Sequence, residues 1–213
     1  MNLKKEYPLL LMVLLPFLYL IFIWNDLPET VPTHWNGLGE IDGYSNKTAL
    51  IWIPFIFPLL IYILLTIVPK IDPKNKINAM GKKYDQLKFI LILFMTALAL
   101  FILYSSNSQS ATNPNILFVL LGMLFAILGN YMKTLKPNYF IGIKTPWTLE
   151  NETVWKKTHI LGGKVWLIGG LAIVFFSMVL SNSINLIFFI STTLLLAIIP
   201  IIYSYLEFKK LKN

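Results

Sequence analysis

Residues 138–164 read NYFIGIKTPWTLENETVWKKTHILGGK and form the longest polar-rich interruption in a largely apolar chain. They hold two of the six tryptophans and one of the two histidines. A loop that only joined two membrane spans would need neither two tryptophans nor the Thr145-Pro146 and Gly162-Gly163 pairs. We therefore interpret this stretch as the functional face of the chain, set between apolar runs on both sides.

The composition indicates that lipid is the main solvent for this chain. The 213 residues are 56% hydrophobic and 13% charged, whereas a soluble domain carries about 25% charged residues. The mean hydropathy is +0.67. The chain has no Cys, which excludes disulfides and thiolate metal sites.

Six apolar runs approach the roughly 20 residues that a membrane-spanning helix needs. They cover residues 8–24, 49–68, 86–104, 116–132, 165–180 and 184–205. No small-x-small cleavage motif follows the first run, so we interpret it as a span and not as a signal peptide. Pro54 and Pro58 lie one turn apart and predict the strongest bend in the second run. The expected fold class is an all-α polytopic membrane protein with six transmembrane helices.

The orientation follows from the lysines, because all eighteen basic residues are Lys. Residues 69–85, 133–164 and the C-terminal tail are rich in Lys, whereas the alternate loops carry only Lys47. The positive-inside rule places the Lys-rich segments and both termini in the cytoplasm. This pattern accounts for the net charge of +8 and predicts no direct contact with nucleic acid.

The first outer loop, residues 25–48, is rich in turn formers such as Pro32 and Gly39, which predicts an ordered, compact loop with an irregular backbone. His34, at its centre, either fixes the loop by a hydrogen bond or contacts a ligand. A metal site built from His34, Glu40 and Asp42 matches no known spacing. The candidates for facing an external ligand are His34, Trp35, Asn36, Glu40 and Asp42.

The signature loop, residues 133–164, predicts a short amphipathic helix at the cytoplasmic membrane interface, between the fourth and fifth spans. Thr145-Pro146 is a typical helix start, with Thr148 as a competing cap. Gly162-Gly163 is expected to end the helix. Its aromatic side chains either anchor the loop in the membrane or bind a partner.

The recognised catalytic motifs are absent: the sequence has no Gly-x-Ser-x-Gly, no His-Glu-x-x-His and no P-loop. We therefore expect a protein that is not an enzyme and binds no metal or cofactor. The alternative is an interfacial membrane enzyme that acts on lipid or peptide, with Glu150, Glu152 and His159 as its acid–base or metal-binding groups. A transporter would need a polar cavity at mid-bilayer.

Two segments resemble a known family. Residues 140–149, followed by Val154-Trp155, Thr158-His159 and Gly162-Gly163-Lys164, resemble the signature of the SdpI family of bacterial membrane immunity proteins. Residues 27–47 are similar to a small membrane domain of unknown function that often precedes that signature. The resemblance implies an N-terminal two-span unit, residues 1–70, and an SdpI-like four-span unit, residues 71–213.

The resemblance also implies a function in the bacterial cell membrane. It implies that the protein gives resistance to a secreted toxic peptide. It also implies a receptor role, in which the protein holds a cytoplasmic transcriptional repressor at the membrane. One departure is Lys144, where the family pattern has Arg, since Lys lacks the bidentate geometry of Arg. The candidates for binding a cytoplasmic partner are Lys144, Thr145, Pro146, Trp147, Glu150, Trp155, Lys156, Lys157 and His159.

The lysine pattern predicts that neither a tag fused to the C-terminus nor a probe attached near residue 150 is accessible from outside intact cells. Both should react once the membrane is permeabilised, because Lys-rich segments stay inside. An impermeant labelling reagent, applied to intact and to permeabilised cells, measures this. Labelling of either position in intact cells would contradict the orientation.

Overall fold

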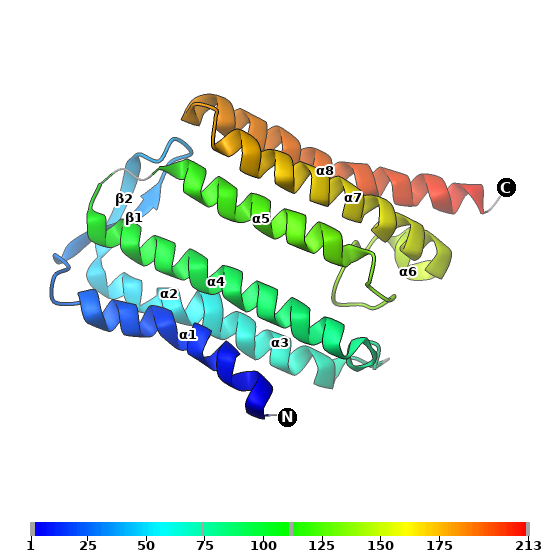
Figure 1. Ribbon diagram of the computed structural model, residues 1–213, viewed down its shortest axis with the longest axis horizontal. Helices are drawn as coiled ribbons and strands as arrows, with labels where there is room; N and C mark the ends of the chain where they lie inside the picture. Colours follow the sequence, from blue (N-terminus) through cyan, green and yellow to red (C-terminus); the bar gives the residue numbers. More distant parts are fainter. Residues whose placement is uncertain (1–2, 74, 111–112, 212–213) are drawn as a thin grey trace. The chain divides into compact units, whose positions relative to one another are not determined.

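The computed structural model describes residues 3–73, 75–110 and 113–211, and the side chains from Glu6 onward. Two lysines of the predicted charge pattern, Lys74 and Lys212, lie outside the described residues. Within the described ranges, six helices are long and apolar enough to cross a membrane. The predicted fold class is therefore confirmed (Figure 1).

The elements follow one another along the chain in the order labelled in Figure 1. They are α1 (Leu3–Ile23), β1 (Thr30–Trp35), β2 (Ile41–Asn46), the 3₁₀ turn η1 (Lys47–Ile51), α2 (Trp52–Pro54), the π-helical turn η2 (Phe55–Leu59), α3 (Leu60–Ile71), the 3₁₀ turn η3 (Asn78–Met80), α4 (Lys82–Ser108), α5 (Pro114–Met132), α6 (Pro146–Glu150), α7 (Glu152–Ser177) and α8 (Asn182–Lys210).

Contacts within the chain divide it into two compact units. Unit 1 comprises Met1–Ile67 and Asp85–Pro114, and unit 2 comprises Val68–Tyr84 and Asn115–Asn213. Unit 1 thus holds α1, both strands, most of the second span and most of α4, whereas unit 2 holds the end of α3, η3 and nearly all of α5 to α8. This grouping places residues 85–114 with the N-terminal part, while the sequence resemblance predicts a division after residue 70.

The first outer loop forms an antiparallel β-hairpin, which the sequence analysis did not predict. β1 pairs with β2 in a two-stranded sheet, with Val31 opposite Ser45 and Pro32 opposite Tyr44. Figure 1 shows the hairpin at the end of unit 1 that lies away from the start of α1. The order and compactness that the turn formers predict are present, but the backbone is mostly extended.

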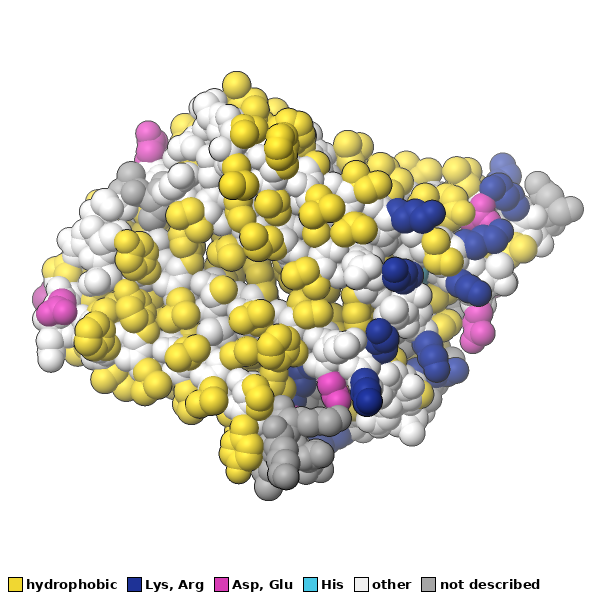
Figure 2. All heavy atoms as spheres, in the orientation of Figure 1, with side chains coloured by type: hydrophobic (Ala, Val, Ile, Leu, Met, Phe, Trp, Pro, Cys, Tyr) yellow, Lys and Arg dark blue, Asp and Glu magenta, His cyan; other side chains and the backbone are white. Residues whose placement is uncertain are grey.

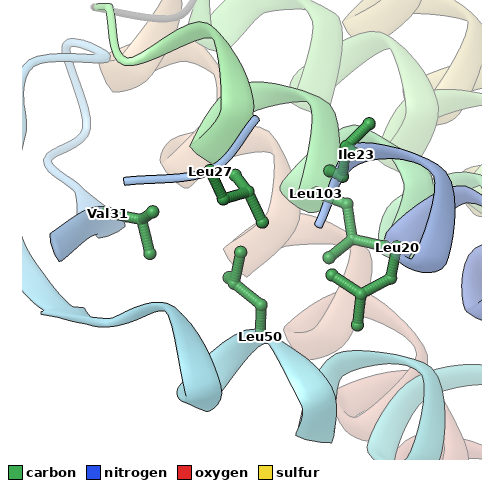
Figure 3. Close-up of a cluster of buried hydrophobic side chains, with 6 residues drawn as sticks. All are labelled: Leu20, Ile23, Leu27, Val31, Leu50 and Leu103. Atoms are coloured by element: carbon green, nitrogen blue, oxygen red, sulfur yellow. The ribbon is translucent and has the colours of Figure 1, made fainter. Parts of the chain in front are cut away.

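An apolar cluster holds the base of the hairpin against the helices of unit 1. Val31 and Leu27 meet Leu50 from η1 and Leu103 from α4, together with two residues near the end of α1 (Figure 3). Val31 and Leu103 are completely buried. Burial of each such side chain stabilises by about 1.5–3 kcal/mol, so the cluster fixes where the hairpin sits within unit 1.

The second span has the irregular geometry expected around its prolines. The turns η1, α2 and η2 succeed one another before the regular helix α3 begins at Leu60. Pro58 lies within the π-helical turn, and Pro54 immediately precedes it. Because neither proline can donate a backbone hydrogen bond, the ordinary α-helical pattern cannot continue through this region.

A buried ion pair joins three helices of unit 1. Lys88 of α4 donates to both carboxylate oxygens of Glu6 in α1, at 3.0 and 3.2 Å. The hydroxyl of Tyr62 in α3 donates to the same carboxylate at 2.9 Å. The Lys88 side chain is 7% exposed, and a charge so placed in an apolar region needs a partner.

In unit 2, α5 and α7 approach so closely that glycine is required at their crossing. A Cβ on Gly129 would lie 2.8 Å from the carbonyl oxygen of Gly163, and a Cβ on Gly170 would lie 2.4 Å from the backbone nitrogen of Ala126. Such small residues let membrane helices pack backbone against backbone.

The prediction that Gly162-Gly163 ends a helix is wrong, because α7 runs without a break from Glu152 to Ser177. Both glycines are buried inside it. Gly162 leaves room for Ile143, and Gly163 for the backbone of α5. The pair therefore serves close packing, and the fifth span is a 26-residue helix that begins well before residue 165.

Large apolar side chains cover the outside of the helices, as Figure 2 shows for one face. Phe22, Ile168, Met178 and Ile187 are each more than 60% exposed, which in water would favour aggregation. A bilayer solvates such a surface, so the chain is a multi-pass membrane protein. In the same view, lysine side chains gather near α6 and the C-terminal end of α8.

Candidate functional site

The signature loop begins with a turn that one buried amide organises. The Oδ1 of Asn138 accepts the backbone N–H groups of Phe140 and Ile141, at 2.8 and 2.7 Å. Its Nδ2 donates to the carbonyls of Lys136 and Ile141, at 2.8 and 3.0 Å. Asn138 is 5% exposed and satisfies four backbone bonds, so the turn has a fixed shape.

Trp155 and His159, one turn apart on α7, contact the part of the signature loop that precedes α6. Their rings stack with centroids 4.1 Å apart, and each side chain is 1% exposed. The indole Nε1–H of Trp155 donates to the carbonyl of Leu135 at 3.0 Å. These contacts tie the start of the loop to the helix that follows it.

Both ring nitrogens of His159 take part in hydrogen bonds to the backbone. Nε2 accepts the N–H of Ile143 at 2.9 Å, so Nε2 carries a lone pair. Nδ1 lies 2.8 Å from the carbonyl oxygen of Trp155 and must donate to it. The contacts therefore assign a neutral imidazole with its proton on Nδ1, and neither nitrogen is available to a ligand.

Gly142 makes this arrangement possible. Its φ of +116° lies where residues with a side chain rarely go. A Cβ at this position would lie 2.5 Å from Nε2 of His159 and 3.2 Å from the Trp155 ring. The glycine in the Phe140–Ile143 stretch is thus needed for both its conformation and its lack of a side chain.

The predicted helix start at Thr145-Pro146 is confirmed. Thr145 caps α6 through a reciprocal capping box with Thr148, and Pro146 occupies the first turn. The Thr145 hydroxyl also lies 3.0 Å from that of Ser204 in α8, and the Trp147 and Tyr205 rings are 5.1 Å apart. The short helix α6 is therefore attached to the C-terminal half of α8.

A three-residue ion cluster joins α7 to α8 beside this attachment. Glu207 of α8 accepts from Lys157 and from Lys210, each at 2.7 Å. The Glu207 side chain is 6% exposed, whereas those of Lys157 and Lys210 are 50% and 69% exposed. Lys157 is thus partly engaged in holding the helices together.

The nine predicted partner-binding residues fall into three groups by exposure. Thr145, Trp155 and His159 are buried, so in this structure they shape the loop from inside. Trp147 is partly buried. Lys144 is exposed and donates to the carbonyls of Tyr139 and Phe140, each at 3.2 Å. The remaining candidates are exposed: Pro146, Glu150, Lys156 and Lys157.

The three residues of the enzyme alternative do not form an acid–base set. Glu150 and Glu152 are exposed, while His159 is buried with both nitrogens occupied. Among the described residues, no group of three His, Asp or Glu side chains could hold a metal ion. The arrangement therefore gives this alternative no support.

Asn36 organises the tip of the hairpin in unit 1. Its Oδ1 accepts the N–H groups of Leu38 and Glu40, at 2.9 and 3.1 Å, and its Nδ2 donates to the Glu40 carboxylate at 2.8 Å. Gly39 takes a φ of +83° to complete the turn. Asn36 and Glu40, both ligand-facing candidates, thus form one closed loop.

His34 and Asp42 form a second pair across the hairpin. The His34 Nδ1 lies 2.5 Å from the Asp42 carboxylate, and the two side chains are 71% and 43% exposed. Gly43 leaves room for the base of the His34 side chain, since a Cβ there would lie 2.9 Å from that of His34. Glu40 pairs with Asn36 instead, so the metal set considered for His34, Glu40 and Asp42 is not assembled.

The signature loop and the hairpin each match a known family model. Residues 134–204 match the model of the SdpI/YfhL protein family, and residues 11–57 match a domain of unknown function, DUF1648. The chain is 31% identical to the immunity protein SdpI of Bacillus subtilis over 212 residues, which is 99% of both chains. The chain belongs to the SdpI/YfhL protein family.

A second similarity is shorter. An uncharacterized protein of Archaeoglobus fulgidus is 36% identical over 58 residues, which cover 27% of this chain and 32% of that protein. No solved structure matches the chain. The family match covers the signature loop, α7 and most of α8, so the contacts of Asn138, Gly142, Trp155 and His159 belong to the segment that defines the family, whereas Tyr205 and Glu207 lie just beyond it.

Several contacts of these sites could not be predicted from the signature alone. Ser204 and Glu207 of α8 support the loop from 59 and 50 residues away in the sequence. Glu207 is the only acidic residue after residue 152, and a lone acid at the end of an apolar helix is a usable signal for a structural ion pair.

We predict that Trp155→Phe destabilises the protein and that Trp147→Phe does not. Phenylalanine at 155 keeps most of the packing but leaves the buried Leu135 carbonyl without its donor, at a cost of about 1–3 kcal/mol. The Trp147 indole N–H makes no hydrogen bond within the described ranges and is the matched control. Thermal unfolding of both variants in detergent measures the difference, and equal stabilities would contradict the scaffold role of Trp155.

Proposed function

We propose that this chain is an integral membrane immunity protein that gives resistance to a secreted toxic peptide. The observation that carries the proposal is the 31% identity to the Bacillus immunity protein SdpI along 99% of both chains. The likeness includes the hairpin as well as the signature loop, because both family segments are matched. Six spans suit a protein that must act at the membrane that the peptide attacks.

In this proposal the hairpin faces outward and meets the peptide. The lysine pattern favours that orientation. Residues 25–48 carry four carboxylates and one Lys, so this loop has a net charge of −3 within a chain of net charge +8. The exposed pairs His34–Asp42 and Asn36–Glu40 offer charged and polar contacts on a rigid support, and the half-buried Trp35 lies between them in sequence.

The signature loop then serves the cytoplasmic side, where it holds a transcriptional regulator at the membrane. The exposed residues Pro146, Glu150, Lys156 and Lys157 would make the contact, with Lys144 beside them. The buried residues Trp155 and His159 would keep that surface in shape. Transmission between the two sides needs an element with two arrangements, and we assign it to the second span, at the π-helical turn around Pro58.

The resistance proposal predicts that expressing the chain protects a sensitive bacterium against one or more secreted peptides. Fractions of culture supernatant from peptide-secreting bacteria serve as the challenge, and the minimal inhibitory concentration is the measurement. It should rise in the expressing strain, because the protein binds or excludes the peptide at the membrane. The control strain carries the same vector without the gene. Unchanged sensitivity to every fraction would overturn the proposal.

The regulator proposal predicts that Lys156→Glu releases the regulator from membranes while resistance is kept. Lys156 is exposed and has no ion-pair partner within the described ranges, so reversing its charge should weaken docking by about three- to tenfold without disturbing the fold. Lys82→Glu, an equal charge change on another exposed lysine, is the control. Fractionation of cells followed by detection of the regulator measures the effect, and loss of both activities together would contradict the separation.

A further inference from the structure

Among the described residues the sheet has two strands, so no further strand is paired with the outer edge of β2. The backbone N–H of Lys47 donates to the carbonyl of Glu29 at 2.9 Å, which sets the alternation of the ladder. Hydrogen-bonded pairs then fall at Glu29/Lys47 and Val31/Ser45, and the pairs between them do not exchange hydrogen bonds. The backbone N–H and C=O of Tyr44 therefore point away from β1.

The opposite edge of the hairpin is closed. Pro32 lies directly across from Tyr44, so its backbone nitrogen faces the outer edge of β1, where it has no hydrogen to donate. The turn η1 also packs against β1, and both Val31 and Pro32 are buried. A third strand can thus join the sheet only beside β2.

The side chains along β2 alternate between exposed and half-buried positions. Tyr44 is 62% exposed, and Asn46, two residues further along the strand, is exposed on the same side. Asp42 is also exposed and lies where the register shifts. With the net charge of −3 on residues 25–48, this edge is complementary to a segment that carries Lys or Arg. Strand addition obtains affinity from backbone hydrogen bonds and selectivity from such side chains.

We propose that β2 receives an extended, cationic segment of the toxic peptide as a third strand, paired through the backbone of Tyr44 and the N–H of Asn46. This inference rests on the proposed resistance function and specifies how its ligand is recognised. The hairpin base, held by Leu27, Val31 and Leu50, supplies a fixed template. The conformational entropy lost on binding would then come from the peptide alone, because the hairpin is already ordered.

The test uses the full chain in lipid nanodiscs and the peptide against which the wild-type chain protects in the resistance assay. Tyr44→Pro removes the outward N–H and should weaken binding by about tenfold or more. Tyr44→Thr keeps that N–H, and Thr30→Pro removes an outward N–H from the closed edge. Tyr44→Thr measures the loss of the ring alone, so Tyr44→Pro should bind about tenfold more weakly than Tyr44→Thr, and Thr30→Pro should stay within about threefold of wild type. Equal binding by Tyr44→Pro and Tyr44→Thr would overturn the proposal.

Hydrogen exchange of the wild-type protein tests the proposal without any variant. Adding the peptide should slow exchange of the Tyr44 and Asn46 amides, while the Ser45 amide, already bonded within the hairpin, should change little. Unchanged exchange at Tyr44 in the presence of saturating peptide would overturn strand addition and leave the resistance function standing. If no peptide is neutralised by the wild-type chain, the proposed function fails and this inference fails with it.

A second copy of the chain is the competing occupant of the edge. The chain has no Cys, so Tyr44→Cys introduces a single thiol. Disulfide-linked dimers formed through that thiol in membranes without peptide would assign the edge to self-association and overturn the proposal. A thiol that stays monomeric, and that peptide protects from a maleimide reagent, supports it.

Discussion

Burial of polar groups in an apolar solvent is the constraint on which the rest of this structure depends. Lipid offers no hydrogen bonds, so each polar group among the helices has to find a partner within the protein. Lys88 and Tyr62 both donate to the carboxylate of Glu6, and Asn138 satisfies four backbone bonds. The partners of the first set come from three helices distant in the sequence, so those bonds also fix how the helices pack, whereas the bonds of Asn138 are local and fix the shape of one turn.

The same constraint explains why the family signature is mostly scaffold. Asn138, Gly142, Trp155 and His159 each support the backbone of the loop or leave room for it. An irregular loop beside a membrane has many backbone groups to satisfy, and fixed side chains are the means of doing so. Exposed residues such as Lys156 do not support the loop backbone, so their side chains can be suited to the partner that they contact.

Local signals predicted some of this structure well. The Thr145-Pro146 helix start is a short-range capping pattern, and the six spans are runs of apolar residues. The prediction at Gly162-Gly163 was wrong because the same glycine pair can end a helix or let a neighbouring helix approach. The close contact between Gly163 and the backbone of α5 shows that it does the second. The hairpin was missed because Pro32 and Gly43 are typical of loops, although Pro32 lies at an outer edge and Gly43 makes room for His34.

The hairpin and the buried ion pair of unit 1 are joined by one continuous segment. Asn46 ends β2 and caps η1 through its side chain, and the chain then passes through the π-helical turn to Tyr62, which bonds Glu6. Both ends of this segment are fixed. If a strand added at β2 displaced the first end, the second end would still be held by the bond between Tyr62 and Glu6. The π-helical turn and an ordinary α-helical turn differ by one residue, and the prolines there donate no hydrogen bonds. Rearrangement along this segment would therefore break fewest bonds at the turn around Pro58.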